Sequence, residues 1–285
     1  MIVQFHIMRF VIVLSLLLCL VLFHNNIYSA AKALYSAAKA KNFSEFGEDS
    51  LPCPHVVHFV VSVFNEDVAW ISDVCLLLKN HKIGRKKVID AWTFYVKNSD
   101  YDVRNIYKRV LQSCSAQTIT LRMVPNFGRE IRSFTDFILN EKIKEETFVF
   151  VQGNMEVKMD FFNTSLAGSF VNHCGSGKQY FSPLSQIETY PHRYFIHVAN
   201  EKVVILSFIE KLKINLTGFQ FHLRGEFIAS AQSIKLFRDR WTPFFIKEVF
   251  PLLHTEENAP LVMYAIERLW LYFFTHGPAD GIILN

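Results

Sequence analysis

Segments typical of buried strands and of amphipathic helices alternate four times between residues 56 and 151. The short apolar stretches are rich in β-branched residues, and the stretches between them repeat apolar residues at helical spacing. This alternation predicts an α/β fold with a doubly wound, mostly parallel sheet. The expected strands are 56–63, 88–96, 118–124 and 148–151, and the expected helices are 68–80, 103–113 and 131–141.

The second half of the chain is less regular, although we expect residues 55–285 to form one domain. The apolar run 195–208 predicts one or two strands, and the alternating run 219–224 predicts a half-buried strand. Helices are expected from residue 230, over 241–253 and over 259–275.

The last of these helices carries two adjacent charges, Glu267 and Arg268, among apolar residues. Adjacent residues do not face one another on a helix, so we expect at least one of them to find a partner elsewhere. That partner is either a charge on another element or a ligand.

Polar residues follow the ends of the predicted strands, where open α/β sheets bind their ligands. Asn65, Glu66 and Asp67 follow the first strand, and the last one ends in Gln152-Gly153-Asn154. These residues are candidates for binding a ligand.

The turn Asn126-Phe127-Gly128-Arg129-Glu130 precedes the predicted helix 131–141. Gly128 permits a tight turn, the free amides of a helix start attract anions, and Arg129 adds a forked cation. The turn is either a phosphate or carboxylate site or an ordinary helix start with Glu130 in its first turn.

The N-terminus carries an unbroken run of 14 mostly apolar residues, 10–23, which predicts a membrane-targeting segment. It is either a signal anchor or a signal peptide, because a full span needs about 20 residues and small residues follow at Ser29 and Ala31. We therefore divide the N-terminal region into this segment (1–29) and a stem (30–54). The lysines after the run would by themselves place the body in the cytoplasm.

Two other features favour a body in the lumen of the secretory pathway, in the endoplasmic reticulum or Golgi. Glycosylation sequons begin at Asn42, Asn163 and Asn215. Four cysteines outside the apolar run, Cys53, Cys75, Cys114 and Cys174, allow up to two disulfides, although free buried thiols are the alternative. The expected protein is a single-pass type II membrane protein or is secreted. Its net charge of only +4 argues against a nucleic-acid partner.

Five blocks in order resemble an uncharacterised eukaryotic domain family, abundant in fungi and known only as a domain of unknown function. The resemblance covers roughly residues 56–275 and implies no activity. The blocks are Val60–Trp70, Asn126–Glu130, Phe148–Gly153, Gly225–Ser230 and Ile266–Trp270.

More distantly, the order of strand-end motifs is similar to that of nucleotide-sugar glycosyltransferases with the A-type fold. The resemblance implies a nucleotide-diphosphate-sugar transferase-like sheet that binds a nucleotide sugar near Asn65, Glu66, Asp67, Asn126, Gly128 and Arg129. It also implies a glycan or protein acceptor. In that family an Asp-x-Asp turn binds a divalent metal on the sugar diphosphate, and Gln152-Gly153-Asn154 stands in its place here.

The missing carboxylates leave the cofactor, Mn²⁺ or Mg²⁺, open, because such sites usually use one or two carboxylates. Either Glu156 or Asp160 supplies the anion, or Arg129 and Arg132 replace the metal, or transfer activity has been lost. No metal ligand is assigned. If transfer occurs, Glu226 and Glu267 are the candidate catalytic carboxyl groups. The alternative is a catalytically silent protein of the same fold that binds a glycan or another partner.

Overall fold

The computed structural model describes most of the predicted domain. The described residues are 56–80, 89–114, 116–126, 128–143, 147–153, 180–185, 187–191, 199–222, 224–253 and 259–276. The predicted membrane-targeting segment and stem lie outside them, as does Asn154. Within the described residues, no helix is long and apolar enough to cross a membrane.

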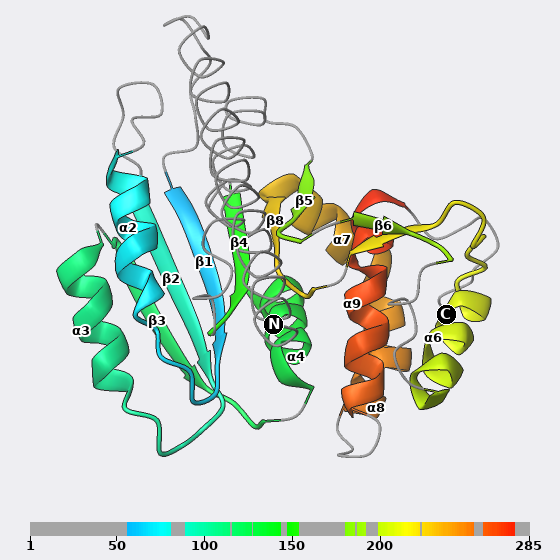
Figure 1. The fold of residues 1–285 in the computed structure, drawn as a ribbon, viewed down its shortest axis with the longest axis horizontal. Coiled ribbons are helices and arrows are strands. Elements are labelled where there is room, and N and C mark those ends of the chain that lie inside the picture. Colours follow the sequence, from blue (N-terminus) through cyan, green and yellow to red (C-terminus); the bar gives the residue numbers. More distant parts are fainter. Residues whose placement is uncertain are drawn as a thin grey trace, which may run out of the picture. The chain divides into compact units, whose positions relative to one another are not determined.

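A six-stranded sheet forms the centre of the fold, in the order β3-β2-β1-β4-β8-β5 (Figure 1). The first four strands along the chain are parallel, β8 runs antiparallel to β4, and β5 runs antiparallel to β8. The strands are β1 (Val56–Val63), β2 (Ile89–Val96), β3 (Thr118–Met123), β4 (Thr147–Gln152), β5 (Phe181–Pro183) and β8 (Phe227–Ser230). The prediction of an α/β fold with a mostly parallel sheet is confirmed, and the strand order is compatible with double winding.

The strand order reverses next to β1. The chain proceeds outward from β1 to β2 and β3, and then returns to place β4 on the other side of β1. Such a reversal leaves a crevice at the carboxyl ends of the two central strands, because the following connections diverge to opposite faces of the sheet.

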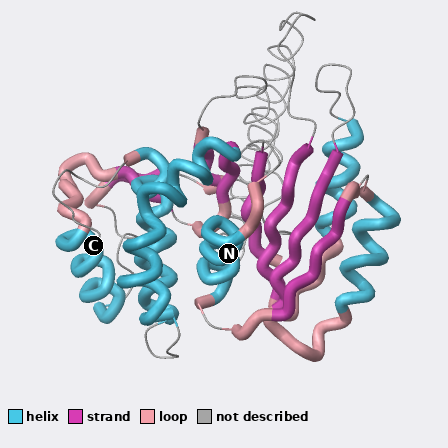
Figure 2. Tube along the Cα trace, turned by 180° about the vertical axis from the view of Figure 1, so that it is seen from behind, coloured by secondary structure: helices cyan, strands magenta, loops and turns pink. Residues whose placement is uncertain are grey.

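Helices cover both faces of the sheet (Figure 2). Alternate residues of a strand point to opposite faces. In β1, Phe59 packs in the cluster that includes α2 (Trp70–Asn80) and α3 (Val103–Ser113), whereas Val60 packs in the cluster that includes α4 (Arg129–Asn140). The central strands are therefore apolar on both faces, which explains their nearly continuous apolar sequences.

The C-terminal half builds a thick aromatic layer against the face that α4 covers. Ser230 caps α7 (Ala231–Phe244) by accepting a hydrogen bond from the Ser233 amide at 3.1 Å. A π-helical turn, η2 (Phe245–Val249), continues this helix into α8 (Phe250–Leu253). The buried helix α9 (Ala259–Thr275) packs beside them and accepts the Trp241 indole N–H on the Phe273 carbonyl at 2.9 Å.

One prediction for this half is wrong. The described part of the run 195–208 is not a strand, because α6 (Ala199–Lys211) occupies it. Ile205, Phe208, Ile209 and Leu212 are buried at helical spacing, three or four residues apart. The β-branched residues in this run made its helical period difficult to recognise from the sequence. The half-buried strand predicted at 219–224 is present as β7 (Gln220–His222), which pairs with β6 (Ile187–Thr189).

Candidate functional site

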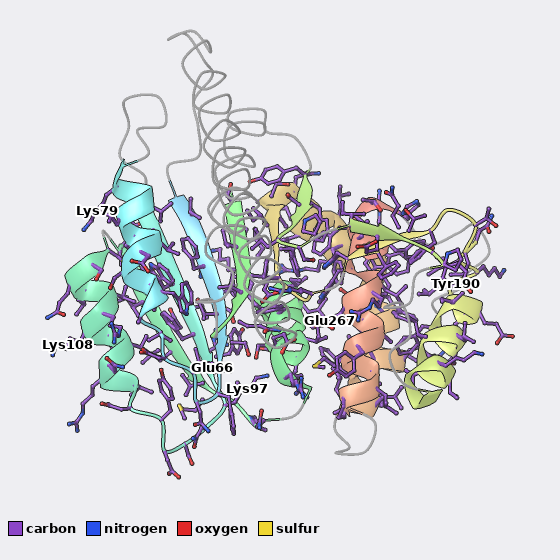
Figure 3. The ribbon with its side chains drawn as sticks, viewed as in Figure 1. Glu66, Lys79, Lys97, Lys108, Tyr190 and Glu267 are labelled. Atoms are coloured by element: carbon purple, nitrogen blue, oxygen red, sulfur yellow. A yellow bond between two sulfur atoms is a disulfide. The ribbon has the colours of Figure 1, made fainter. Side chains whose placement is uncertain are left out.

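A cavity of about 410 Å³ lies at the carboxyl ends of the central strands and at the start of α4. Figure 3 shows two of its residues, Glu66 and Lys97, close together at that end of the sheet. This is the edge at which the strand order reverses, where an α/β sheet is expected to bind a ligand. Among the described residues, the cavity is lined by Ser62, Phe64, Glu66, Lys97, Asn126, Arg129, Glu130 and Gln152.

Glu66 and Gly153 fix the turn after β4 against the turn after β1. The Glu66 carboxylate accepts a hydrogen bond from the Phe64 amide at 2.6 Å, and the Gly153 amide donates to the Ser62 carbonyl at 2.7 Å. The Trp70 indole N–H donates to the Gly153 carbonyl at 2.6 Å. A Cβ at position 153 would lie 2.8 Å from Glu66 Oε2, so glycine allows this close approach.

The other residues after β1 have local structural contacts and do not line the cavity. The Asn65 side chain accepts a hydrogen bond from Asn98. Asp67 accepts a hydrogen bond from the Ala69 amide at 3.0 Å, just before α2 begins, and forms an ion pair with Arg109 at 3.5 Å. Of the three candidates at this strand end, only Glu66 reaches the cavity.

The start of α4 has an unusual backbone. Gly128 (φ 66°) and Arg129 (φ 41°) both have positive φ, which a non-glycine residue rarely adopts. A Cβ at Gly128 would lie 2.9 Å from Leu253 Cδ2. The N-cap residue Gly128 has no side chain to cap the helix, and the Arg129 guanidinium lies 6.0 Å from the centre of the Tyr264 ring.

Gln152 and Glu130 join the end of β4 to the first turn of α4. The Gln152 amide donates a hydrogen bond to Glu130 Oε1 at 2.6 Å. Glu130 is buried, and this burial raises the pKa of its carboxyl group above the usual range. Gln152 therefore lies at the cavity as predicted, but one side of its amide is already engaged by Glu130.

Glu226 and Glu267, the candidate catalytic residues, lie behind Glu130. Both are buried, and neither lines the cavity among the described residues. A Cβ at Gly225 would lie 3.4 Å from both Glu130 Cγ and Glu267 Oε1. Burial, together with the charges of Glu130 and Glu226, raises the pKa of Glu267. The structure thus gathers three carboxyl groups, of which Glu130 faces the cavity.

The last helix corrects the premise that Glu267 and Arg268, as adjacent residues, do not face one another. Arg268 Nη1 donates to Glu267 Oε2 at 3.2 Å, so the two adjacent residues do pair. Adjacent side chains on a helix point in different directions, which disfavours this contact when both are exposed. Here both side chains are buried, and the long arginine side chain bends toward the carboxylate. Glu267 also has partners on other elements, because burial and the charges of Glu130 and Glu226 raise its pKa while Arg268 opposes that shift.

Lys97 is a cavity residue that the sequence interpretation missed. It directly follows β2, and its amide donates to the Val63 carbonyl at 2.9 Å. The side chain is 8% exposed, and its Nζ has no hydrogen-bond partner among the described residues. Burial lowers the Lys97 pKa to about 8, although the Glu130 and Glu66 carboxylates oppose this shift. The rule that ligands bind at strand ends, applied to β2, would have found this residue.

Comparison with known proteins adds no relative. The chain matched no protein-family model and no curated protein. The resemblances to the uncharacterised domain family and to the glycosyltransferases therefore stay predictions from the sequence blocks.

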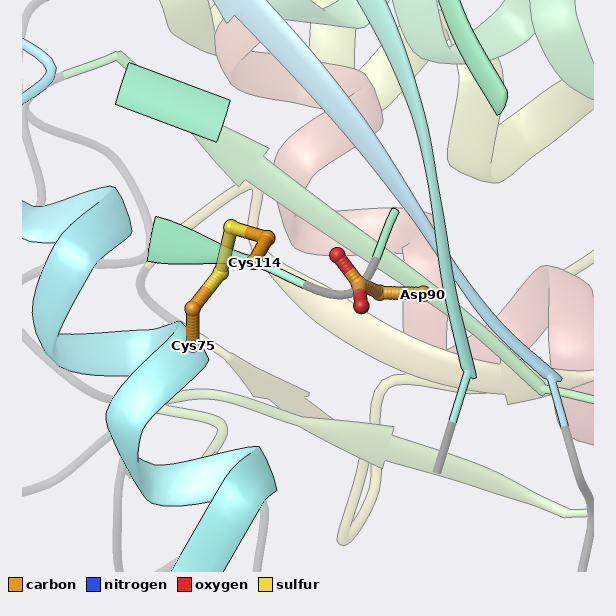
Figure 4. A group of neighbouring side chains, drawn as sticks. All are labelled: Cys75, Asp90 and Cys114. Carbon is orange, nitrogen blue, oxygen red and sulfur yellow. A yellow bond between two sulfur atoms is a disulfide. The ribbon is translucent and has the colours of Figure 1, made fainter. Parts of the chain in front are cut away.

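A second group with metal-binding residue types lies away from the cavity. Cys75, Asp90 and Cys114 have ligand atoms within 4.8 Å of one another, and they form the only such group of three in the described ranges (Figure 4). The two sulfurs form a disulfide, and Asp90 accepts a hydrogen bond from the Trp92 indole at 2.6 Å. In this state the group has no thiolate to offer a metal. Cys53 and Cys174 lie outside the described residues.

Proposed function

We propose that this protein is a glycosyltransferase-like protein that binds a nucleotide sugar in the cavity at the carboxyl ends of β1, β2 and β4. The observation that carries the proposal is the convergence of Glu66, Asn126, Arg129 and Gln152 on one cavity from separate strand ends. The A-type glycosyltransferases that the sequence resembles use the corresponding strand ends for the nucleotide and its diphosphate.

The three carboxyl groups indicate which residues would assist a transfer reaction. A base or a stabilising carboxylate must lie within reach of the acceptor. Glu130 is the member of the three-carboxyl cluster that faces the cavity, and we assign it this position. Glu226 and Glu267 act through Glu130, because they are buried behind it and the three groups are close enough for charge on one to raise the pKa of another.

The test is binding and turnover with the purified full-length protein. We expect nucleoside diphosphates or nucleotide sugars to raise the melting temperature, and we expect Arg129→Ala to reduce that shift. Arg104→Ala is the matched control, because Arg104 is exposed on α3. A broad panel that gives no shift, with and without Mn²⁺, would contradict the proposal.

A catalytically silent binding protein is the second candidate. The engagement of Gln152 by Glu130, in the place of a metal-binding carboxylate, favours it. In that case a glycan or another partner binds and no sugar is released from any donor. Binding that survives Glu130→Gln, together with no turnover, would support this candidate.

The proposal includes placement in the secretory pathway, anchored by the N-terminal segment or secreted. The Cys75–Cys114 disulfide supports an oxidising compartment, where such bonds persist. The sequon at Asn215 supports it too, because Asn215 and Thr217 are exposed in the loop between α6 and β7.

A further inference from the structure

Lys97 is a buried cation that the fold holds at the edge of the cavity. Its backbone amide is fixed to the Val63 carbonyl, so the end of β1 determines where the side chain begins. An ammonium group removed from water is costly unless it is paired. Lys97 Nζ is buried and has no hydrogen-bond partner among the described residues, although Lys97 is one of the residues that line the cavity.

The acidic residues nearby do not neutralise this cation. The carboxylates of Glu66 and Glu130 are close enough to raise the Lys97 pKa, but burial and the cations Arg129 and Arg132 lower it more. Glu66 is engaged by the Phe64 amide, and Glu130 by Gln152. Both carboxylates therefore hold the loops around the cavity, while the ammonium group is buried in the cavity wall with no hydrogen-bond partner among the described residues.

The first turn of α4 faces the same cavity through Arg129 and Glu130. A helix of 12 residues carries a partial positive charge at its N-terminus, and the N-cap residue of this one, Gly128, has no side chain to cap it. The cavity thus combines a helix start, the exposed guanidinium of Arg129 and the buried ammonium of Lys97.

We propose that Lys97 and the first turn of α4 bind the phosphate groups of the ligand directly, without a divalent metal between protein and diphosphate. This inference rests on the proposed function for the identity of the ligand. Lys97 takes the charge-neutralising place of the metal, because the fixed ammonium group repels a divalent cation while Glu66 and Glu130 are engaged by the Phe64 amide and by Gln152. The inference also explains why position 152 carries an amide and not an acid. A neutral amide can hold Glu130 in place without competing for Lys97.

The test compares full-length wild type, Lys97→Met and Lys79→Met in excess chelator, with inorganic pyrophosphate and a nucleoside diphosphate as probes. Lys79 is the matched control because it is exposed at the opposite end of the sheet (Figure 3). We expect both probes to bind wild type and Lys79→Met, by calorimetry and by thermal shift. Loss of a charge-assisted contact should weaken binding to Lys97→Met by about tenfold or more.

A second variant distinguishes the effect of the Lys97 charge on binding from a defect in folding. Lys97→Arg keeps the positive charge at high pH, so we expect its affinity for pyrophosphate to show no loss from deprotonation of residue 97 between pH 7 and 9. The affinity of wild type should fall as pH rises through about 8, where the Lys97 ammonium loses its proton. A wild-type profile that matches the Lys97→Arg profile would overturn the inference, and this measurement remains informative if Lys97→Met fails to fold.

The outcomes also separate this inference from the proposed function. Nucleotide sugars that bind only with Mn²⁺, and bind Lys97→Met as well as wild type, would overturn the inference and leave the proposed function standing. Pyrophosphate that binds through Lys97 while no nucleotide binds more tightly would support the phosphate site and overturn the nucleotide-sugar function. Binding of neither probe and of no nucleotide sugar, with or without Mn²⁺, would overturn both.

Discussion

The side-chain amide of Gln152 donates a hydrogen bond to the buried carboxylate of Glu130, with 2.6 Å between Nε2 and Oε1. This contact joins the last residue of β4 to the second residue of α4 across the candidate site. It also connects the cavity to the buried carboxyl groups of Glu226 and Glu267.

Removing this contact should destabilise the protein. Gln152→Leu removes one donor from the buried Glu130 carboxyl group, which should lower the free energy of unfolding by about 1–3 kcal/mol. Urea unfolding at pH 7 measures the loss. Gln112→Leu is the control, because Gln112 is exposed on α3 and should change stability by less than about 0.5 kcal/mol. Equal effects of the two variants would show that the contact contributes nothing.

Reduction of the Cys75–Cys114 disulfide should also destabilise the protein. The bond closes a loop of 39 residues, and constraining the unfolded chain to that extent corresponds to about 3–4 kcal/mol in the entropic account. Urea unfolding with and without a reductant measures the difference. The double variant Cys75→Ala with Cys114→Ala should show no response to reductant, and a response in that variant would point to other cysteines.

His222 should make stability depend on pH. Complete burial, with a smaller contribution from the Arg268 charge, lowers the His222 pKa to about 3. The unfolded side chain has a pKa of about 6.5 and therefore binds a proton first as pH falls. This contribution to stability is present above about pH 6.5 and is lost progressively toward pH 3, by about 2 kcal/mol between pH 7 and 5.

The measurement is urea unfolding of wild type and His222→Asn at pH 7 and at pH 5. The difference between their pH dependences isolates His222 from the acidic residues, which titrate in both proteins. Parallel pH dependences would mean that the folded protein accommodates the charged imidazole.

Asn215 should carry an N-linked glycan when the protein is made in secreting eukaryotic cells. Asn215 and Thr217 are exposed, and the Asn215 side chain accepts a hydrogen bond from the Thr217 amide at 2.9 Å in an open turn. Digestion with a glycosidase should shift the mobility of wild type and of Thr217→Ser. Thr217→Val should lack one step of that shift, and an unchanged pattern in Thr217→Val would contradict modification at this residue.

The local pattern of the sequence determined the first half of the fold. Continuous apolar runs can be buried on both faces of a parallel sheet, so β1, β2 and β4 were identifiable, and the polar residues after β1 and β4 marked the edge at which the cavity lies. The helix α3 (Val103–Ser113) begins and ends where the sequence predicted, because its apolar residues repeat at helical spacing. At α6 the β-branched run favoured a strand, and only packing against other elements showed the helical period.

Tertiary structure alone decided how the candidate residues meet. Glu130, Gln152, Glu226 and Glu267 are far apart in the chain, and the pairing of β4 with both β1 and β8 brings their carboxyl and amide groups together. The environment of Lys97 was equally hidden, because burial and the absence of a hydrogen-bond partner among the described residues depend on side chains from several elements. Sequence patterns specify which faces are apolar, but distances and desolvation, which set the chemistry of charged groups, arise only when separate elements pack.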